Sequence, residues 1–474
     1  MKNNNNNTLE TGLTDNLLLL TDSYKIGGHW NMFPDNTEAC HSYFEARTGS
    51  KWDDIVFFGL QACIKRHLLG QVVTQEKIDL ASEICKVHLG NDKAFNRAGW
   101  QAILDEFGGR LPVVIRAVPE GSVIPVSNVL MTIRNLGGEK FKWIVGYLET
   151  LLTNYMWYGS TVATQSRDAK ARVKKFLEAN SDNTLVDFFI HDFGARSVAV
   201  PEQALLGGMA HLINFKGTDT VSALYGAVRL YNADLNSLGF SVPASEHQLM
   251  SALGREGEAK MVGDLLDKYP TGILSLVADT YNVYDFAEKI CGETYREKIL
   301  SRNGTLVIRP DSGDPETVML KLASILWKKF GGTTNSKGYK VINPKVRLLW
   351  GDGINMQGVS NILGFLAVNG FAAENVACFG IGSNLLQKVN RDDASFAFKC
   401  SAQMRDGVWH DVYKDPIDGC KKSKRGVLKL VKTVTGFETR TANEPGEDFM
   451  VEVFNCGNLV KEYNFEEIRK NARI

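Results

Sequence analysis

Arginines and glycines in several short motifs are suited to binding phosphate groups. Arg196, in HDFGARS, and Arg309, in VIRPDSGDP, each carry a planar guanidinium that can hold two phosphate oxygens at once. The turn FGIGS at 379–383 follows an apolar run, and backbone N–H groups of such a turn can hold a phosphate where the next helix begins. Glycine in a turn after a strand is common for backbone reasons alone, so this signal is weak by itself.

Carboxylates and one histidine in similar motifs could act on a sugar. Asp311, in RPDSGDP, and Asp352, in WGDG, could accept hydrogen bonds from sugar hydroxyls or bind Mg²⁺ through water. For either aspartate alone, capping the next helix is an equally good interpretation. His247 follows Glu246 in SVPASEH, and Asp279 in VADTYN could fix its tautomer. A lone histidine is more often structural, and the carboxylate from a neighbouring cluster favours a functional role.

An aromatic residue and a basic loop each have two interpretations. Phe193, in HDFGAR, could be an ordinary core residue, as most phenylalanines are, or could stack on a flat heterocycle. The loop KDPIDGCKKSKRG at 414–426 is more typical of a solvated turn than of a phosphate clamp. The residues alone therefore indicate an enzyme for a phosphorylated sugar and a flat ring, without naming the reaction.

These clusters recur in a regular order between about residues 150 and 385. An apolar run precedes each cluster and an amphipathic helical stretch follows it, as in VDFFI-HDFGARS, INF-KGTDT, ILSLVADTYN and VRLLWGDG. Repeated strand, polar cluster and helix predict parallel β/α units. In a closed β/α barrel the loops after the strands share one face, where active sites lie. An open doubly wound sheet is the alternative, but no G-x-G-x-x-G opens a helix after the first strand, which favours the barrel.

The flanking segments predict a second domain. Residues 54–69 carry apolar residues at helical spacing, whereas LPVVIRAVPEGSVIPVSNVLMTI, VLKLVKTV and FMVEVF are strand-like. We therefore predict an α/β protein with a β/α barrel at 151–385 that carries the active site. Residues 15–150 and 386–474 would form an α+β domain, and the asparagine-rich tail at 1–14 would be disordered.

The composition is that of an ordinary globular enzyme. Lys+Arg and Asp+Glu are both 54, so a nucleic-acid partner is not expected, and anions must be held by local groups. The eight cysteines are scattered without C-x-x-C spacing, which predicts reduced thiols in the cytoplasm rather than a disulfide framework or a zinc site. No apolar run is long enough to span a bilayer, so no membrane association is expected.

Longer strings, taken together and in order, resemble the nicotinamide phosphoribosyltransferase family from about residue 17 to the C-terminus. They are LLTDSYKIGGHW, HDFGARS, INFKGTDT, SVPASEH, VIRPDSGDP, GDG, LLQKVNRD and YNFEEIRKNARI. The resemblance implies a type II phosphoribosyltransferase fold and transfer of a phosphoribosyl group from phosphoribosyl pyrophosphate to nicotinamide in NAD salvage. It also implies a homodimer with active sites at the subunit interface.

The resemblance assigns roles to individual residues. Phe193 and Tyr24 of the partner subunit would stack on the pyridine ring, and Asp219 in KGTDT would accept from the carboxamide. A nicotinate carboxylate would be repelled by Asp219, which favours nicotinamide. The remaining substrate-binding assignments are Asp22, Arg47, Arg196, Ser275, Arg309, Gly351, Asp352, Gly382, Ser383 and Arg391 of the partner subunit.

The family also implies ATP as a co-substrate and Mg²⁺ as a cofactor, with no metal ligands assigned. ATP hydrolysis would proceed through a phosphorylated His247, oriented by Glu246 and Asp279, while Asp311 would stabilise positive charge on the sugar. The chain departs from animal members at Phe188, Ala195, Ile381, Ser383 and Asn384. These departures concern the channel to the ring and the phosphate cradle.

Three rival functions remain at this point. A nicotinate phosphoribosyltransferase is the nearest, and Asp219 argues against it. A catalytically idle relative would be expected to lose part of its charged set, which is intact here. A sugar-phosphate aldolase or isomerase on a barrel would need a Schiff-base lysine, and no strand-end cluster offers an obvious one.

Overall fold

The computed structural model describes residues 15–417 and 422–474, so the predicted disorder of 1–14 and part of the basic loop lie outside the described residues. The chain divides into two compact units. The first, here called the sheet unit, comprises Met1–Thr161, Leu230–Asn232 and Asn390–Ala472. The second, the barrel unit, comprises Val162–Arg229, Ala233–Val389 and Arg473–Ile474.

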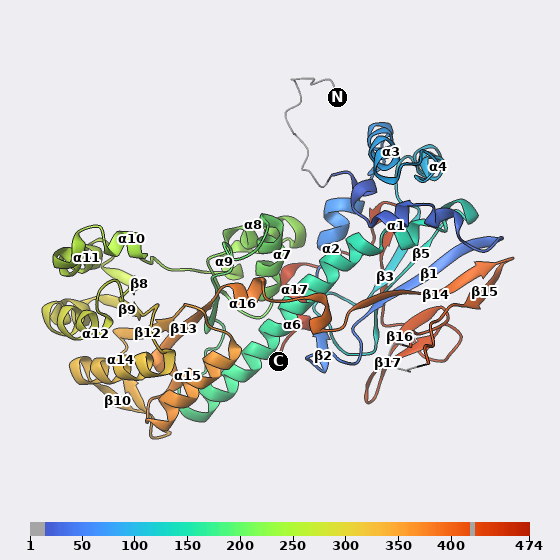
Figure 1. Ribbon diagram of the computed structural model, residues 1–474. Helices are drawn as coiled ribbons and strands as arrows, with labels where there is room; N and C mark the ends of the chain where they lie inside the picture. The colour runs from blue at the N-terminus through green and yellow to red at the C-terminus, as the bar shows by residue number, and fades with distance from the viewer. Residues whose placement is uncertain (1–14, 418–421) are drawn as a thin grey trace, which may run out of the picture. The chain divides into compact units, whose positions relative to one another are not determined.

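The barrel unit is built on six parallel strands in the order β7-β6-β13-β12-β9-β8. Strands β8, β9, β12 and β13 are labelled in Figure 1. Their bounds are β6 Ile190–Asp192, β7 Gly217–Thr218, β8 Thr271–Val277, β9 Asn303–Arg309, β12 Val346–Trp350 and β13 Val376–Ile381. Residues 240–244 bridge both edge strands: Phe240 pairs with Gly217 of β7, and Ala244 pairs with Ser275 of β8. The strands and this segment therefore form a ring in chain order, which confirms the predicted β/α barrel architecture.

Helices connect successive strands of the barrel unit, as parallel pairing requires. They are α7 Pro201–Leu212, α8 Val221–Tyr231, α9 Leu235–Leu238, α10 His247–Met250, α11 Gly254–Lys268, α12 Val283–Asp285, α13 Arg296–Ser301, α14 Pro315–Phe330 and α15 Met356–Val368. Helix α6 Glu149–Asn180 precedes β6, and α16 Ser383–Leu386 follows β13. A small hairpin, β10 Gly332–Thr334 and β11 Lys340–Ile342, follows α14.

Helix α14 shows why these sequences form helices at these places. Asp314 caps the helix by accepting from the Thr317 N–H at 3.0 Å, and Pro315 occupies the first turn, where its missing N–H costs nothing. One face buries Val318, Met319, Leu322, Ala323, Leu326 and Phe330. The polar cluster after β9 thus begins a helix as well as contributing to a site.

The sheet unit is built on an antiparallel seven-stranded sheet in the order β15-β14-β1-β5-β3-β18-β19. These strands are β1 Thr37–Glu45, β3 Val113–Ala117, β5 Val129–Asn135, β14 Ala397–Arg405, β15 Val408–Asp411, β18 Val451–Asn455 and β19 Asn458–Leu459. A short pair, β2 Asp54–Val56 and β4 Val123–Pro125, lies outside this sheet. The helices are α1 Ser23–Ile26, α2 Leu60–Cys63, α3 Gln75–Leu89, α4 Arg97–Phe107, α5 Ile144–Tyr147 and α17 Phe465–Asn471.

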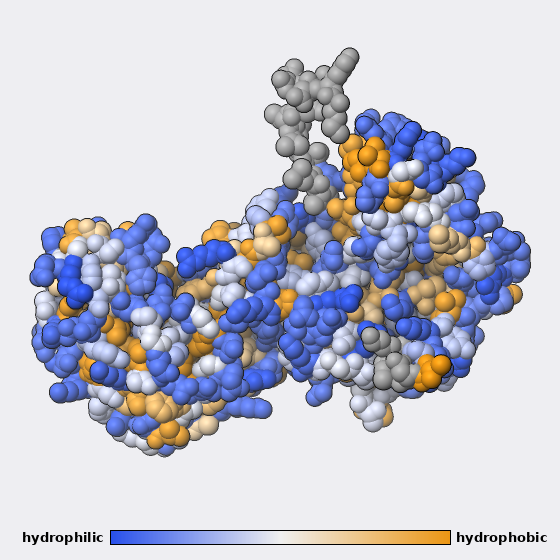
Figure 2. Space-filling model, viewed as in Figure 1, coloured by the Kyte–Doolittle hydropathy of each residue, from blue (hydrophilic) through white to orange (hydrophobic). Residues whose placement is uncertain are grey.

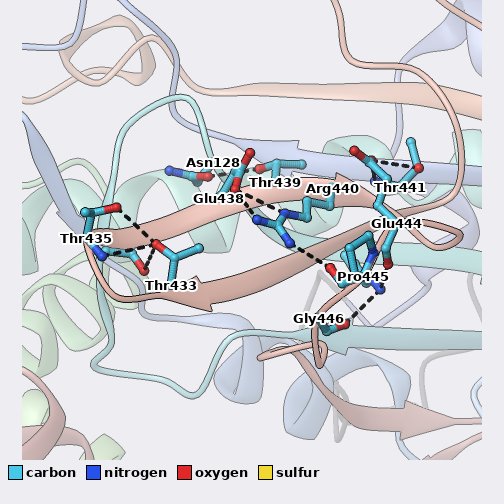
Figure 3. Close-up of polar contacts among 12 residues, drawn as sticks. Asn128, Thr433, Thr435, Glu438, Thr439, Arg440, Thr441, Glu444, Pro445 and Gly446 are labelled. Atoms are coloured by element: carbon cyan, nitrogen blue, oxygen red, sulfur yellow. Dashed lines mark hydrogen bonds and ion pairs between the residues drawn. The ribbon is translucent and has the colours of Figure 1, made fainter.

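A second hairpin of this unit, β16 Leu428–Thr433 and β17 Gly436–Thr441, is held by local polar contacts (Figure 3). Arg440 donates to Glu438 at 2.6 Å and to the Pro445 carbonyl at 2.7 Å. Thr439 donates to Asn128 at 3.1 Å, which ties the hairpin to the residue before β5.

The visible face of each unit is mostly hydrophilic, with hydrophobic residues in small groups (Figure 2). Among the described residues, no helix is both long enough and apolar enough to span a membrane.

Candidate active site

A cavity of about 320 Å³ opens among the strands of the barrel unit, and we call it the barrel pocket. Its walls are mostly apolar, with a few polar side chains, as is typical of sites for small flat ligands. It is lined by Phe188, His191, Phe193, Asp219, Phe240, Ser241, Val242, Ala244, Ile273, Ser275, Val307, Arg309, Leu349, Ala377 and Cys378. Four residues predicted to bind the substrate, Phe193, Asp219, Ser275 and Arg309, therefore share this pocket.

The Phe193 ring is held against two glycines. A Cβ atom at Gly380 would lie 2.1 Å from ring atom Cε2 of Phe193, and one at Gly351 would lie 3.0 Å from it. The Phe193 N–H donates to the Ile381 carbonyl at 3.1 Å, which fixes the backbone beneath the ring. Glycine at 380 is thus required by the close approach of Phe193, and the residue predicted to hold ribose, Gly351, also borders this ring.

Asp219 follows β7 and has two hydrogen-bond donors on a single oxygen. His191 Nε2 lies 2.9 Å from Asp219 Oδ1, and Ser241 Oγ donates to the same oxygen at 2.5 Å. Burial acts to raise the pKa of Asp219, but the bonds from His191 and Ser241 outweigh it and lower the pKa below its ordinary value. Burial acts to lower the pKa of His191, yet Asp219 and Cys378 raise it to about 9. Asp219 is therefore an ionised acceptor at neutral pH.

His191 and Ser241 were missed in the sequence, although HDFGARS and GFSVPASEH contain them. Ser275 was predicted, and its Oγ is buried in the barrel pocket without a hydrogen-bond partner among the described residues. A buried, unpaired hydroxyl that lines a cavity is available to a ligand.

His247 begins α10 and faces two carboxylates from neighbouring loops. Its Nε2 lies 3.7 Å from Asp279 Oδ1 and 3.7 Å from Asp311 Oδ2, and its Nδ1 lies 3.3 Å from Thr280 Oγ1. About half of the side chain (51%) is exposed, so the ring is accessible to a ligand. The structure thus brings together three of the four residues predicted to be catalytic. The fourth, Glu246, accepts from Gln248 at 2.5 Å, and no hydrogen bond joins its side chain to His247 within the described chain.

Arg309 and three carboxylates form the polar end of this group. Arg309 Nη2 donates to the Ser245 carbonyl at 3.1 Å, while its Nε is buried without a partner among the described residues. Burial raises the pKa of Asp311, opposed by Arg309 and supported by the negative charges of Asp279 and Asp352. Several carboxylates gathered around Asp311 suit a hydrated cation. No cluster of three His, Cys, Asp or Glu side chains in described positions could bind a metal directly.

The barrel-unit residues predicted to bind the 5-phosphate, Gly382 and Ser383, lie at the start of α16. Gly382 precedes this helix and Ser383 is its first residue. A Cβ at Gly382 would lie 3.1 Å from Ser197 Oγ, so this turn packs closely on the HDFGARS segment. Arg196, in that segment, is exposed to solvent.

The sheet unit has a separate cavity of about 240 Å³ that is rich in cations, which we call the cation pocket. Arg47, Arg391, Lys399 and Lys414 line it. Its one acidic residue, Glu149, is paired with Lys25 at 2.6 Å outside the cavity lining, which leaves an excess of positive charge. Burial lowers the pKa of Lys399; the charge of Glu149 opposes this shift, and the charges of Arg47, Lys25 and Arg391 add to it. Such a pocket favours an anion.

Two members of the cation pocket, Arg47 and Arg391, were predicted to bind phosphate, and the structure brings them together. Lys399 and Lys414 were missed. Lys414 belongs to the basic loop that was expected to be a solvated turn, and residues 418–421 of that loop lie outside the described residues.

The remaining predicted residues, Asp22 and Tyr24, are at the start of α1 in the sheet unit. Asp22 Oδ2 accepts from Thr150 Oγ1 at 2.6 Å. The Tyr24 ring is 62% exposed, with Lys25 Nζ 5.1 Å from its centroid. An exposed aromatic ring of this kind is available for stacking on a ligand.

Comparison with known proteins places this geometry in a family. Residues 16–115 match the nicotinamide phosphoribosyltransferase N-terminal domain, and residues 188–458 match the nicotinate phosphoribosyltransferase (NAPRTase) family. A nicotinamide phosphoribosyltransferase of Xanthomonas campestris pv. campestris is 45% identical over 471 residues, covering 97% of this chain and 98% of the relative. The chain belongs to the nicotinamide phosphoribosyltransferase family.

A second relative and two solved structures are also similar to this chain. A nicotinamide phosphoribosyltransferase of Acinetobacter baylyi is 32% identical over 96% of each chain. The crystal structure of nicotinate-nucleotide pyrophosphorylase from Pyrococcus furiosus has a TM-score of 0.61 at 16% identity, covering 100% of this chain and 97% of that one. The crystal structure of human nicotinic acid phosphoribosyltransferase has a TM-score of 0.53 at 15% sequence identity, covering 96% of this chain and 93% of that one. These likenesses confirm the fold predicted for a type II phosphoribosyltransferase.

Proposed function

We propose that this protein transfers the phosphoribosyl group of phosphoribosyl pyrophosphate to nicotinamide, giving nicotinamide mononucleotide and pyrophosphate. The observation that carries the proposal is the ionised Asp219 in an otherwise mostly apolar pocket beside Phe193. A carboxylate accepts from a carboxamide N–H and repels a carboxylate. The names of the relatives support the same substrate.

The reaction is a displacement at the anomeric carbon. The pyridine nitrogen donates its electron pair to this carbon, and the bond to pyrophosphate breaks with its electrons on the departing oxygen. Phe193 and Asp219 orient the ring for attack, a positioning effect. Asp311 stabilises the positive charge that develops on the sugar. Arg309, aided by Arg196, binds the pyrophosphate.

Mg²⁺ is part of the proposal as a cofactor. The carboxylates of Asp311 and Asp352 would hold it through water, consistent with the effect of the Asp352 charge on the pKa of Asp311, and the ion would neutralise charge on the departing pyrophosphate. The ribose hydroxyls would bind near Gly351 and Asp352. Gly382 and Ser383, with Arg391 of the partner subunit, would bind the 5-phosphate, and Arg47 would contact a phosphate group.

ATP coupling is proposed to proceed through His247. A ring nitrogen attacks the γ-phosphorus of ATP, ADP leaves, and water later hydrolyses the phosphohistidine. The exposure of His247 and its carboxylate neighbours Asp279 and Asp311 support this role. His247→Ala should abolish ATP hydrolysis while leaving a slow, ATP-independent synthesis. Retained ATP hydrolysis in that variant would overturn this part of the proposal.

We further propose a cytoplasmic homodimer with active sites at the subunit interface, where Tyr24 of the partner subunit stacks on the ring. Mixing Tyr24→Ala protein with His247→Ala protein should restore ATP-coupled synthesis if one subunit completes the site of another. Absence of recovery in a verified mixed dimer would contradict shared sites.

The deciding experiment for the reaction is a product assay with phosphoribosyl pyrophosphate, Mg²⁺ and either nicotinamide or nicotinate, with and without ATP. Mononucleotide from nicotinamide alone is expected. Product from nicotinate alone would support the proposed reaction but show that the substrate is nicotinate. Product from neither would favour a catalytically idle relative.

A further inference from the structure

The two oxygens of the Asp219 carboxylate have different surroundings. Oδ1 accepts hydrogen bonds from His191 Nε2 at 2.9 Å and from Ser241 Oγ at 2.5 Å. No hydrogen bond reaches Oδ2 from the part of the chain that the structure describes, and the residue lines the barrel pocket. A carboxylate held by one oxygen presents the other in a fixed direction, and a fixed acceptor direction adds geometric specificity to recognition.

We propose that His191 is a positioning residue for nicotinamide recognition: with Ser241 it holds Asp219 Oδ1 so that Oδ2 accepts from the carboxamide. This inference rests on the proposed function and adds the residue that makes Asp219 a directed acceptor. His191 acts through Asp219 and not by contact with the reacting atoms.

The position of the His191 ring is itself constrained on several sides. A Cβ at Gly217 would lie 2.7 Å from His191 Nδ1, so this glycine leaves room for the imidazole. The Phe193 ring meets His191 edge-on, with centroids 5.2 Å apart. Only 12% of the His191 side chain is exposed. The ring that stacks on the substrate and the ring that orients its acceptor therefore pack against each other, and neither can turn freely.

The charged and titratable groups around His191 come from four elements. Asp219 follows β7, Cys378 lies on β13, Asp192 lies on β6 and His211 lies on α7. Asp219 and Cys378 favour the protonated imidazole, as does the buried Asp192 where it is ionised. His211 is fully buried, and burial followed by the charge of His191 lowers its pKa to about 3, so it stays neutral. His191 is thus a cation that faces Asp219 at neutral pH.

The kinetic test uses two substitutions, one that removes the donor and one that supplies another donor. His191→Leu removes the hydrogen bond to Asp219, whereas His191→Gln places an amide N–H near the former Nε2. Loss of a bond to a charged group should raise KM for nicotinamide about tenfold in His191→Leu, with KM for phosphoribosyl pyrophosphate within about twofold of wild type. His191→Gln should recover most of the affinity, and Ser241→Ala should show a smaller change of the same kind.

The outcomes separate a positioning role from a structural one. Equal rises in both KM values, or no recovery in His191→Gln, would overturn the proposal, because a general disturbance of the pocket does not discriminate between substrates. An unchanged KM for nicotinamide in His191→Leu would also overturn it.

A measurement without turnover distinguishes this inference from the proposed function. The His191 ring carbon can be followed by NMR in histidine-labelled protein across a pH titration, in wild type and in Asp219→Asn. We expect titration of His191 near pH 9 in wild type and a clear downward shift in Asp219→Asn. If the shift is seen but no mononucleotide forms, the His191–Asp219 pair stands and the proposed reaction fails. If His191 titrates alike in both proteins, the positioning role fails whatever the activity.

Discussion

The barrel pocket and the cation pocket differ in how far their charged side chains are paired with opposite charges. In the barrel pocket, Asp219 is an anion already paired with His191 and Ser241, and apolar side chains form most of the remaining wall. In the cation pocket, four basic side chains line one cavity, and the acidic Glu149 is engaged with Lys25. In the first pocket the anion Asp219 has a paired cation, His191, whereas the second pocket has more cations than anions.

This difference shows what each pocket is suited to select. Paired polar groups with fixed directions recognise the shape and donor pattern of a neutral ring, and they gain little from the net charge of the ligand. Uncompensated cations attract any anion of suitable size, and their effect weakens as salt increases. We therefore expect the amide substrate and the phosphate-bearing substrate to respond to different changes in the protein.

The largest effect is expected from the cation pocket. Lys399→Ala combined with Lys414→Ala should raise KM for phosphoribosyl pyrophosphate about 100-fold, because two charge-assisted contacts to phosphate are lost. KM for nicotinamide should change little. Steady-state kinetics at two ionic strengths would check this, and the salt dependence of the first KM should weaken in the variant.

Lys140→Ala is the matched control. Lys140 is an exposed lysine of the same unit that pairs with Glu106 at 2.7 Å and does not line the cation pocket. It should leave both KM values unchanged. If the double variant behaves like this control, the cation pocket is not a phosphate site.

The next largest effect concerns the acceptor in the barrel pocket. Asp219→Ser should lower the preference for nicotinamide over nicotinate about 30-fold, since it removes both a charged acceptor and a repulsive charge. The ratio of kcat/KM for the two substrates measures this directly. Undiminished preference for the amide would mean that selectivity lies elsewhere in the pocket.

A third prediction tests whether the close packing of the Phe193 ring on Gly380 is needed for binding nicotinamide. Gly380→Ala places a methyl group where the Phe193 ring now lies, 2.1 Å from Cε2, so the ring must move. We expect KM for nicotinamide to rise about tenfold, as overpacking of a fitted site displaces side chains. Gly364→Ala is the control, because a Cβ there meets nothing within 4 Å. Similar kinetics for the two variants would show that the Phe193 position is not critical.

The sequence predicted the barrel pocket better than the cation pocket, for a physical reason. Strand, cluster and helix repeat locally, so the parallel order of the barrel and the convergence of Phe193, Asp219 and Arg309 follow from short segments. The closure of the ring is harder to predict from the sequence. Residues 240–244 form only isolated β-bridges to β7 and β8, so this part of the ring is not a regular strand.

The cation pocket depends on contacts between distant parts of the chain. Glu45 pairs with Ala397 across β1 and β14, which brings Arg47 beside Ser395 and near Lys399. No local periodicity signals a pairing of segments so far apart, and Lys399 in a strand-like run carries no sign of its role. His191 was missed for a similar reason, because its partner Asp219 is 28 residues away on the next strand connection.

The smallest effect is a difference in how stability depends on pH. The pKa of His191 is raised from 6.5 to about 9 in the folded protein, so its pairing with Asp219 contributes stability that is complete below pH 6.5 and lost as pH rises through about 9. Asp219 is 47% exposed, and solvent screening reduces the contribution to about 1 kcal/mol. The lowered pKa of Asp219 matters only in acid, outside this window. Asp219→Asn should therefore be less stable than wild type near neutral pH and equal to it in strong base.

Removing the charge of Lys399 should change stability near neutral pH in the opposite direction from removing the charge of Asp219. Burial and neighbouring cations, opposed in part by Glu149, lower its pKa from 10.5, so its charge costs stability at neutral pH, and the cost disappears as Lys399 loses its proton with rising pH. Lys399→Met should gain stability near neutral pH, where Asp219→Asn loses it. Denaturant unfolding of both variants from about pH 6 to about pH 10 would measure the two differences. Changes of the same sign would contradict the contrast between the paired charge of Asp219 and the excess of positive charge around Lys399.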